Sequence, residues 1–213
     1  MPNNSAVRGV EDVLLNLCES VTNVLNTATN DCVRYSPMVQ VIQKTCLKPD
    51  IASFVLFDGG FSGLVVINFS ADAAMELYSK YLSNMGFPNN ELAHSHTAAE
   101  VANVMGELLN QMVGDFTRRI EADLHTNITQ SQPKMLVLNK EVMLRVDTNL
   151  DHPQARRISF YTGNNHVFYV ELAMDDVSFI PLQKSPAAQP LPKKNHKKKT
   201  AENHNELLKS LGM

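Results

Sequence analysis

The sequence predicts an α+β domain, a layered sandwich in which long helices pack on an antiparallel sheet. Two patterns in the 213-residue chain lead to this prediction. In three segments, apolar residues recur every three or four positions, which is typical of helices with one buried face. Among these segments lie short runs rich in Val, Ile and Phe, separated by turns that contain Gly or Asn, as in antiparallel strands. Helices grouped among such strands are typical of layered α+β domains.

The apolar spacing predicts three helices, over residues 10–30, from Ser70 onward, and over about 97–124. Ser70 is the predicted N-cap of the second helix, because its hydroxyl can accept a hydrogen bond from a free N–H group of the first turn. Gly86 and Pro88 end that helix. The predicted packing faces of the first two helices are Val10, Val13, Leu14, Leu17, Val21, Val24 and Leu25, and Ala74, Leu77, Tyr78 and Tyr81.

Extended segments with strand-like composition account for most of the remaining sequence up to about residue 174. Asp58-Gly59-Gly60 separates two of them and predicts a hairpin. Gly163-Asn164-Asn165 predicts a turn between the last two. The predicted extended segments are residues 33–45, 51–57, 61–69, 134–146, 156–161 and 167–174.

Composition points to a cytoplasmic protein. Hydrophobic residues make up 44% of the chain, enough for a core, but the apolar runs are far too short to cross a bilayer. The first residues do not resemble a signal peptide, so we expect no stable membrane insertion. Cys18, Cys32 and Cys46 are odd in number and lack metal-site spacing, and we expect reduced thiols and no metal site.

Residues 184–213 differ in character from the rest. They hold seven Lys and two Glu, and the segment before them holds 12 basic and 20 acidic residues. An acidic body repels phosphate backbones, which argues against nucleic-acid binding. We therefore predict a domain over residues 1–183 and, over 184–213, a disordered Pro/Lys-rich linker that ends in a short peptide. Leu207, Leu208 and Leu211 would make that peptide either a frayed end or a docking element.

The long helix carries an unusual polar stripe. Asn103, Glu107, Asn110 and Gly114 recur at one-turn intervals, opposite the apolar face. Every amphipathic helix has a polar face, but Asn and Gly are poor residues for an exposed helix interior. A helix that needed only solubility would use Lys, Gln or Glu there. The apolar face consists of Val101, Val104, Met105, Leu108, Leu109, Met112, Val113, Phe116 and Ile120.

This stripe resembles the signature of the CheX/CheC phosphatases of bacterial chemotaxis. In that family the pattern is Asp or Ser, three residues, Glu, two residues, Asn, then 22 residues and Pro. Here Glu107, Asn110 and Pro133 fall in place, and Gly114 matches a glycine that is common after the Asn. Asn103 stands where the family has Asp or Ser. The resemblance covers residues 10–175 and implies the CheX/CheC-like fold.

A second register also contains Glu-x-x-Asn. Glu100 and Asn103 would then be the pair, with His96 at the Asp/Ser position and Thr126 at the Pro position. Because neither flanking residue matches the signature, the sequence favours the register with Glu107 and Asn110.

The resemblance implies a phosphatase that acts on the aspartyl phosphate of a CheY-like response regulator. Asn110 would orient the attacking water, because a carboxamide both donates and accepts hydrogen bonds. Glu107 would contact the active-site Lys of the regulator, and Asn103, Gly114 and Pro133 would belong to the partner-binding surface. The chain would need no cofactor of its own, since Mg²⁺ belongs to the regulator.

A non-catalytic CheX-like scaffold, which binds a response regulator or a flagellar switch component, is the alternative. The resemblance also leads us to expect a homodimer formed through sheet edges.

Overall fold

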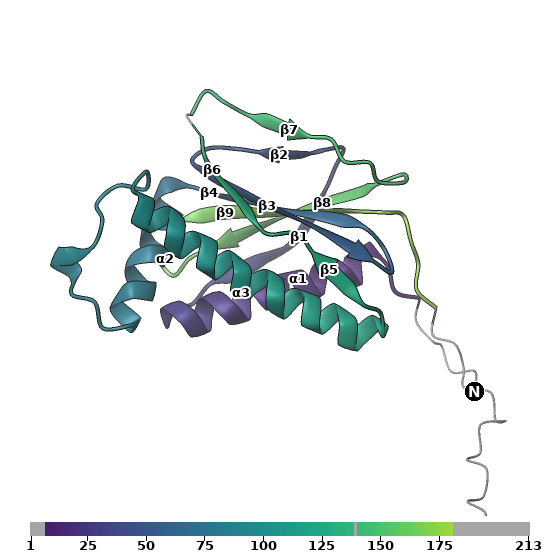
Figure 1. The fold of residues 1–213 in the computed structure, drawn as a ribbon, viewed down its shortest axis with the longest axis horizontal. Coiled ribbons are helices and arrows are strands. Elements are labelled where there is room, and N and C mark those ends of the chain that lie inside the picture. Colours follow the sequence, from purple (N-terminus) through teal and green to yellow (C-terminus); the bar gives the residue numbers. More distant parts are fainter. Residues whose placement is uncertain (1–6, 139, 181–213) are drawn as a thin grey trace, which may run out of the picture. The chain divides into compact units, whose positions relative to one another are not determined.

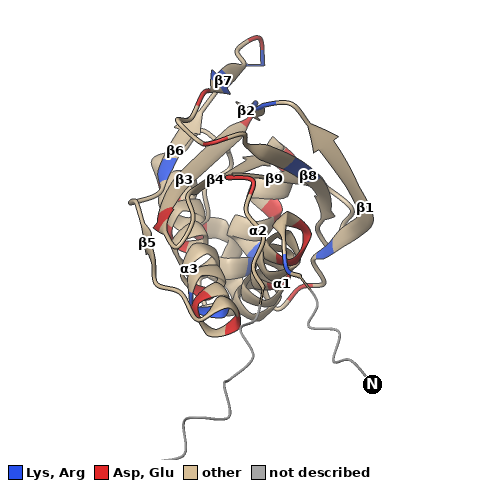
Figure 2. Ribbon diagram, turned by 90° about the vertical axis from the view of Figure 1, so that its right-hand side faces the viewer, with Lys and Arg blue, Asp and Glu red and all other residues tan. Residues whose placement is uncertain are grey.

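The computed structural model describes residues 7–138 and 140–180. Within these residues the fold is the predicted α+β sandwich. Three helices cover one face of an antiparallel sheet, and a small two-stranded sheet lies on its other face (Figures 1 and 2). The predicted linker and C-terminal peptide, residues 184–213, lie outside the described residues. No described helix is long and apolar enough to cross a membrane.

The three predicted helices are confirmed within about two residues at their ends. They are α1 (Val10–Thr29), α2 (Ala71–Asn84) and α3 (Ala99–Leu124). The Ser70 Oγ accepts a hydrogen bond from the Ala73 N–H at 3.2 Å, so it caps α2 as predicted. Along one side of the helical layer, α3 lies next to α1, and its other side contacts strands β5 and β6.

The main sheet has the strand order β1-β8-β9-β4-β3-β5, and β6 pairs with β3 beside β5. Strand β1 therefore forms one edge, and β5 and β6 share the other. The two-stranded sheet consists of β2 and β7. The strands are β1 (Arg34–Ile42), β2 (Thr45–Leu47), β3 (Ile51–Gly59), β4 (Gly63–Phe69), β5 (Ile128–Gln130), β6 (Lys134–Val137), β7 (Leu144–Val146), β8 (Gln154–Tyr161) and β9 (Val167–Met174).

The sheet buries both of its faces, which creates two apolar cores. Strand β4 shows this directly, because all seven of its residues are buried. Its alternate side chains Val65, Ile67 and Phe69 face the helices and join the large core. Leu64 and Val66 point the other way, into a small core under the two-stranded sheet. The helices therefore rest on a rigid platform, which fixes the position of α3.

Two predicted strand segments were wrong in their extent. The predicted segment 33–45 is broken after Ile42, so that β2 leaves the main sheet for the small one. The predicted segment 134–146 is likewise divided into β6 in the main sheet and β7 in the small sheet. In both cases the chain crosses from one layer to the next, and both halves have strand-like composition. Strand β5 was not predicted, because only three residues form it.

Candidate functional site

The four residues of the α3 stripe (Asn103, Glu107, Asn110 and Gly114) are all exposed. On the opposite side of the helix, the apolar residues from Val101 to Ile120 pack into the core with at most 1% of their surface exposed, apart from half-buried Val104. The helix is thus held by one face and offers the other to solvent. A single helix backbone fixes the spacing of the stripe, because residues three and four apart are neighbours on its surface.

Glu107 is oriented by a neighbour on its own helix. The Gln111 Nε2 donates a hydrogen bond to the Glu107 Oε1 at 2.9 Å, across one helical turn. Within the described residues, Glu107 Oε2 has no hydrogen-bond partner and can accept from a group on another molecule. The sequence analysis did not single out Gln111, although its i, i+4 spacing from Glu107 was a usable signal.

Gly114 leaves open space at the C-terminal end of the stripe. A Cβ atom placed there would meet nothing within 4 Å. A glycine in a helix interior costs about 1 kcal/mol relative to alanine, and no neighbouring atom requires one here. Its residue type is therefore not explained by packing among the residues that the structure describes, and close approach of another surface would explain it.

Strands β5 and β6 run beside α3 and bring Pro133 to the stripe. Thr117 Oγ1 and Gln130 Oε1 lie 2.9 Å apart, and a Cβ placed on Gly106 would stand 3.8 Å from the Met135 Cε. On α3 the two contacts are eleven residues apart, from Gly106 to Thr117, and on the extended segment they are five residues apart, from Gln130 to Met135. Both spans are about 16 Å, so the helix and the extended segment run antiparallel between these contacts. Half-buried Pro133 lies between the two contacts, at the level of Asn110.

The stripe has two sides. At about 100° per residue, Gly106, Asn110 and Thr117 fall on the side of β5 and β6. Glu107 and Gly114 fall on the side away from these strands. Asn110 is therefore the stripe residue that leans toward Pro133. Helical spacing predicts the exposed position of the stripe, but its neighbour β6 is not predictable in this way, because strand pairing over 80 residues leaves no local pattern.

The second register has a different geometry. Glu100 is exposed in the first turn of α3, and half-buried His96 precedes the helix. Thr126 follows the last residue of α3, whereas Asn103 lies in its second turn. The helix between them spans roughly 30 Å. Only the register with Glu107 and Asn110 therefore has its third position, Pro133, at the level of its Asn.

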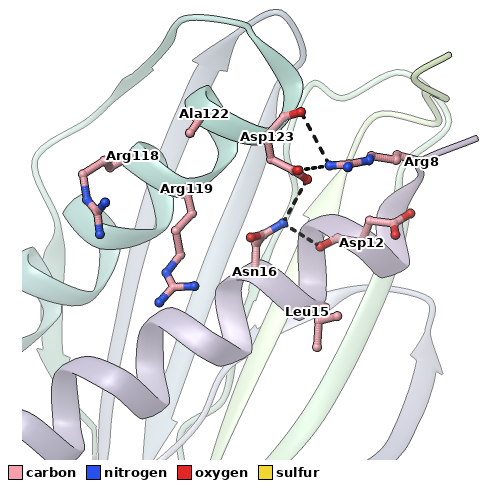
Figure 3. Close-up of a pocket in the computed structure, with 8 residues that line it drawn as sticks. All are labelled: Arg8, Asp12, Leu15, Asn16, Arg118, Arg119, Ala122 and Asp123. Carbon is pink, nitrogen blue, oxygen red and sulfur yellow. Dashed lines mark hydrogen bonds and ion pairs between the residues drawn. The ribbon is translucent and has the colours of Figure 1, made fainter. Parts of the chain in front are cut away.

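A depression of about 640 Å³ lies between α1 and α3 (Figure 3). Its lining contains the ion pair of Arg8 with Asp123, and Arg119 pairs with two residues outside the lining, Asp115 at 2.6 Å and Glu19 at 2.8 Å. Burial acts to raise the pKa of the Asp115 carboxyl, but hydrogen bonds from Arg119 and Arg118 outweigh it and hold that pKa below its usual value. No stripe residue lines this depression, and the ion pair between Arg119 of α3 and Glu19 of α1 joins the two helices.

No group of three or more His, Cys, Asp or Glu side chains that could hold a metal ion occurs among the described residues. The stripe itself offers one carboxylate and two carboxamides on an open helix face. Such a surface suits contact with another macromolecule better than capture of a small molecule, because small-molecule sites are concave and largely apolar.

Comparison with known proteins gives a family and a fold. Residues 4–213 match the family described as "Protein of unknown function (DUF3334)". No curated protein matches the chain. Among solved structures, the chemotaxis protein CheX from Desulfovibrio desulfuricans superposes with a TM-score of 0.64 at 16% identity, over 77% of this chain and 99% of that one.

Two further structures share the fold. The chain matched in the CheX–CheY–BeF3–Mg²⁺ complex from Borrelia burgdorferi gives a TM-score of 0.54 at 16% identity, over 78% of this chain and 99% of that one. FliY from Thermotoga maritima gives 0.53 at 16% identity, over 76% of this chain and 84% of that one. The chain therefore belongs to the DUF3334 family, and its described domain has the CheX/CheC-like fold.

Proposed function

We propose that this protein is a phosphatase that hydrolyses the aspartyl phosphate of a CheY-like response regulator. The observation that carries the proposal is the placement of the signature residues. Glu107 and Asn110 are exposed on one helix face, and the spacing between the two contacts of α3 with β5 and β6 puts Pro133 near the level of Asn110. The fold supports it, since a chain of the same fold was solved in a complex that contains CheY, BeF3 and Mg²⁺.

In the proposed reaction, Asn110 enters the regulator's active site and holds a water molecule in line with the phosphorus. The water oxygen attacks phosphorus, and the bond between phosphorus and the aspartyl oxygen breaks. The bonding electrons return to the carboxylate, and both protons of the water leave with inorganic phosphate as H2PO4⁻. Catalysis of this kind depends on positioning and on charge stabilisation more than on covalent chemistry from the enzyme.

Glu107 anchors the complex in this proposal. Its free Oε2 accepts a hydrogen bond from the active-site Lys of the regulator, while Gln111 holds Oε1. The Mg²⁺ that neutralises phosphoryl charge belongs to the regulator, and the phosphatase supplies no metal ligand. Asn103, Gly114 and Pro133 contribute to the surface that the regulator covers. We place the reaction in the cytoplasm, where such regulators act.

A non-catalytic scaffold is the second candidate, and Asn103 favours it. The residue stands where the family signature has Asp or Ser, so the stripe lacks one charge that the phosphatases can carry. The likeness to FliY is a second reason to retain this candidate. The scaffold would bind a regulator or a switch component and leave the aspartyl phosphate intact.

The two candidates differ in one measurement, the dephosphorylation rate of CheY-like regulators from the same cell with trace amounts of this protein added. The phosphatase proposal expects one regulator to lose its phosphate at least tenfold faster, with many turnovers per phosphatase molecule. A regulator that binds but keeps its intrinsic decay rate would rule out the phosphatase and favour the scaffold.

A further inference from the structure

Strand β6 presents an apolar edge next to the α3 stripe. It pairs with β3, and no other described strand covers its outer side. Val137 at its end is 43% exposed, although Val is a residue that proteins usually bury. An uncovered edge strand with apolar side chains is a liability, unless another molecule covers it.

The pairing register fixes which way these side chains point. Met135 lies opposite Ser53 and Val137 lies opposite Ile51. Ile51 belongs to the core on the helix side of the sheet, so Val137 points to that side as well. Two strand residues correspond to about four helical residues along α3. The Met135 side chain lies over Gly106, and Val137 therefore lies near the level of the first stripe residue, Asn103.

The stripe alone is too small for a protein partner. A specific interface buries about 800 Å² on each side and involves 20–30 residues, so the partner must also cover ground beside α3. On the α1 side, exposed Arg118 and half-buried Arg119 share ion pairs with Asp115. The β6 side offers apolar groups instead, and the centre of an interface is depleted in charge.

We propose that the response regulator docks across α3 and β6, and that Val137 lies in the buried centre of that interface. This inference rests on the proposed function for its partner and assigns the partner's footprint. The regulator's phosphorylation site would face Asn110, and an apolar part of its surface beside that site would cover Val137. Half-buried Met135 would support the contact from beneath, because it packs on the core.

Val39 provides a matched control. It is a valine on the opposite edge strand, β1, with 40% of its surface exposed. We would prepare Val137→Asp, Val137→Thr and Val39→Asp in the full chain. Affinity would be measured by titration calorimetry against the regulator activated with BeF3⁻ and Mg²⁺. Hydrolysis would be measured separately, at saturating phosphatase.

We expect Val137→Asp to raise the Kd about tenfold or more, because a charge would be buried without a partner. Val137→Thr keeps the side-chain shape and the strand propensity, and it should raise the Kd by a smaller factor, about threefold. Val39→Asp should bind like the wild type. Hydrolysis at saturation should also be unchanged in Val39→Asp, because Val39 lies on the opposite edge of the sheet.

An unchanged Kd for both Val137 variants would overturn the docking inference and leave the phosphatase proposal intact. Equal loss of affinity in Val137→Asp and Val39→Asp would overturn it as well, since the effect would not be local to β6. Specific loss in the Val137 variants, with a wild type that binds but does not hydrolyse, would support the docking surface and reject the phosphatase. A wild type that binds no regulator would overturn both proposals.

Discussion

Met135 of β6 lies over Gly106 of α3, where a Cβ atom on the glycine would stand 3.8 Å from the Met135 Cε. That separation is an ordinary van der Waals contact, so alanine fits at position 106. The other glycine of the helix, Gly114, faces open space. An added methyl group would therefore meet Met135 at position 106, and it would meet no described atom within 4 Å at position 114.

We predict that Gly106→Ala and Gly114→Ala each raise the free energy of unfolding by about 0.5–1 kcal/mol, because alanine is the better helix former. Only Gly114→Ala should weaken regulator binding, since its methyl group would stand between the two proteins. Urea denaturation and binding titrations check the two expectations. Equal affinity for both variants would remove Gly114 from the interface.

Glu107 and Glu100 decide between the two registers. We predict that Glu107→Gln raises the Kd for the activated regulator about tenfold, because the charge-assisted hydrogen bond to the regulator's Lys becomes a neutral one. Glu100→Gln, an equally exposed change one register earlier, should leave affinity within about twofold. The reverse order of effects would favour the register with Glu100 and Asn103.

Lys80 bridges the buried carboxyl of Glu76 and the half-buried carboxyl of Asp31, which accept hydrogen bonds from backbone N–H groups of the turn between β8 and β9. It donates to Asp31 at 2.7 Å and to Glu76 at 2.6 Å. Burial acts to raise the pKa of both carboxyls, but hydrogen bonds outweigh it and hold both pKa values below the ordinary range. For Glu76 these bonds come from Lys80, Thr162, the backbone N–H of Asn164 and His166.

When folding lowers the pKa of a carboxyl, that carboxyl stabilises the folded protein. Its full contribution is present at pH values above its pKa in the unfolded state, about 4, and is lost as the pH falls through its pKa in the folded state. We therefore predict that Lys80→Met is destabilised at pH 7, and that its deficit relative to wild type shrinks below about pH 4. Lys44→Met removes an exposed pair with Asp147 and is the control, with little change expected. A deficit for Lys80→Met that stays constant down to pH 3 would contradict this account.

The three cysteines should differ in reactivity. Burial, with a smaller contribution from the charge of Glu19, raises the pKa of the Cys18 thiol to about 12. Cys32 is exposed and Cys46 half-buried. We predict that iodoacetamide at pH 8 modifies Cys32 first and Cys18 only after unfolding, as peptide mass spectrometry would show. Early modification of Cys18 in the folded protein would mean that the α1 face is not buried as described.

Local patterns predicted the helices and the stripe well, because helical periodicity is written in neighbouring residues. Ser70 was recognisable as a cap, and the alternation of Asn and Glu with the apolar face of α3 identified the exposed side. The layer changes after Ile42 and Val137 were not predicted, since strand-like residues continue across them. Polar pairs, Gln43-Lys44 and Lys140-Glu141, mark both breaks and were the available signal.

The neighbourhood of the stripe depends on long-range pairing. Nothing near Met135 or Val137 in the sequence indicates that β6 pairs with β3 and thereby lies beside α3. The spacing of 22 residues from Asn110 to Pro133 fits the signature, but its physical meaning appears only in the fold. The chain turns after α3 and returns along the helix, which brings Pro133 back to the level of Asn110.

The most direct test compares Asn110→Ala with Asn103→Ala in single-turnover dephosphorylation of the regulator at saturating phosphatase. Both changes remove an exposed carboxamide from the same helix face, one register apart. We expect Asn110→Ala to bind the regulator normally but to hydrolyse its phosphate about 100-fold more slowly or worse, because the water is no longer oriented. Asn103→Ala should keep most of its activity. Equal hydrolysis by wild type and Asn110→Ala would contradict the central claim.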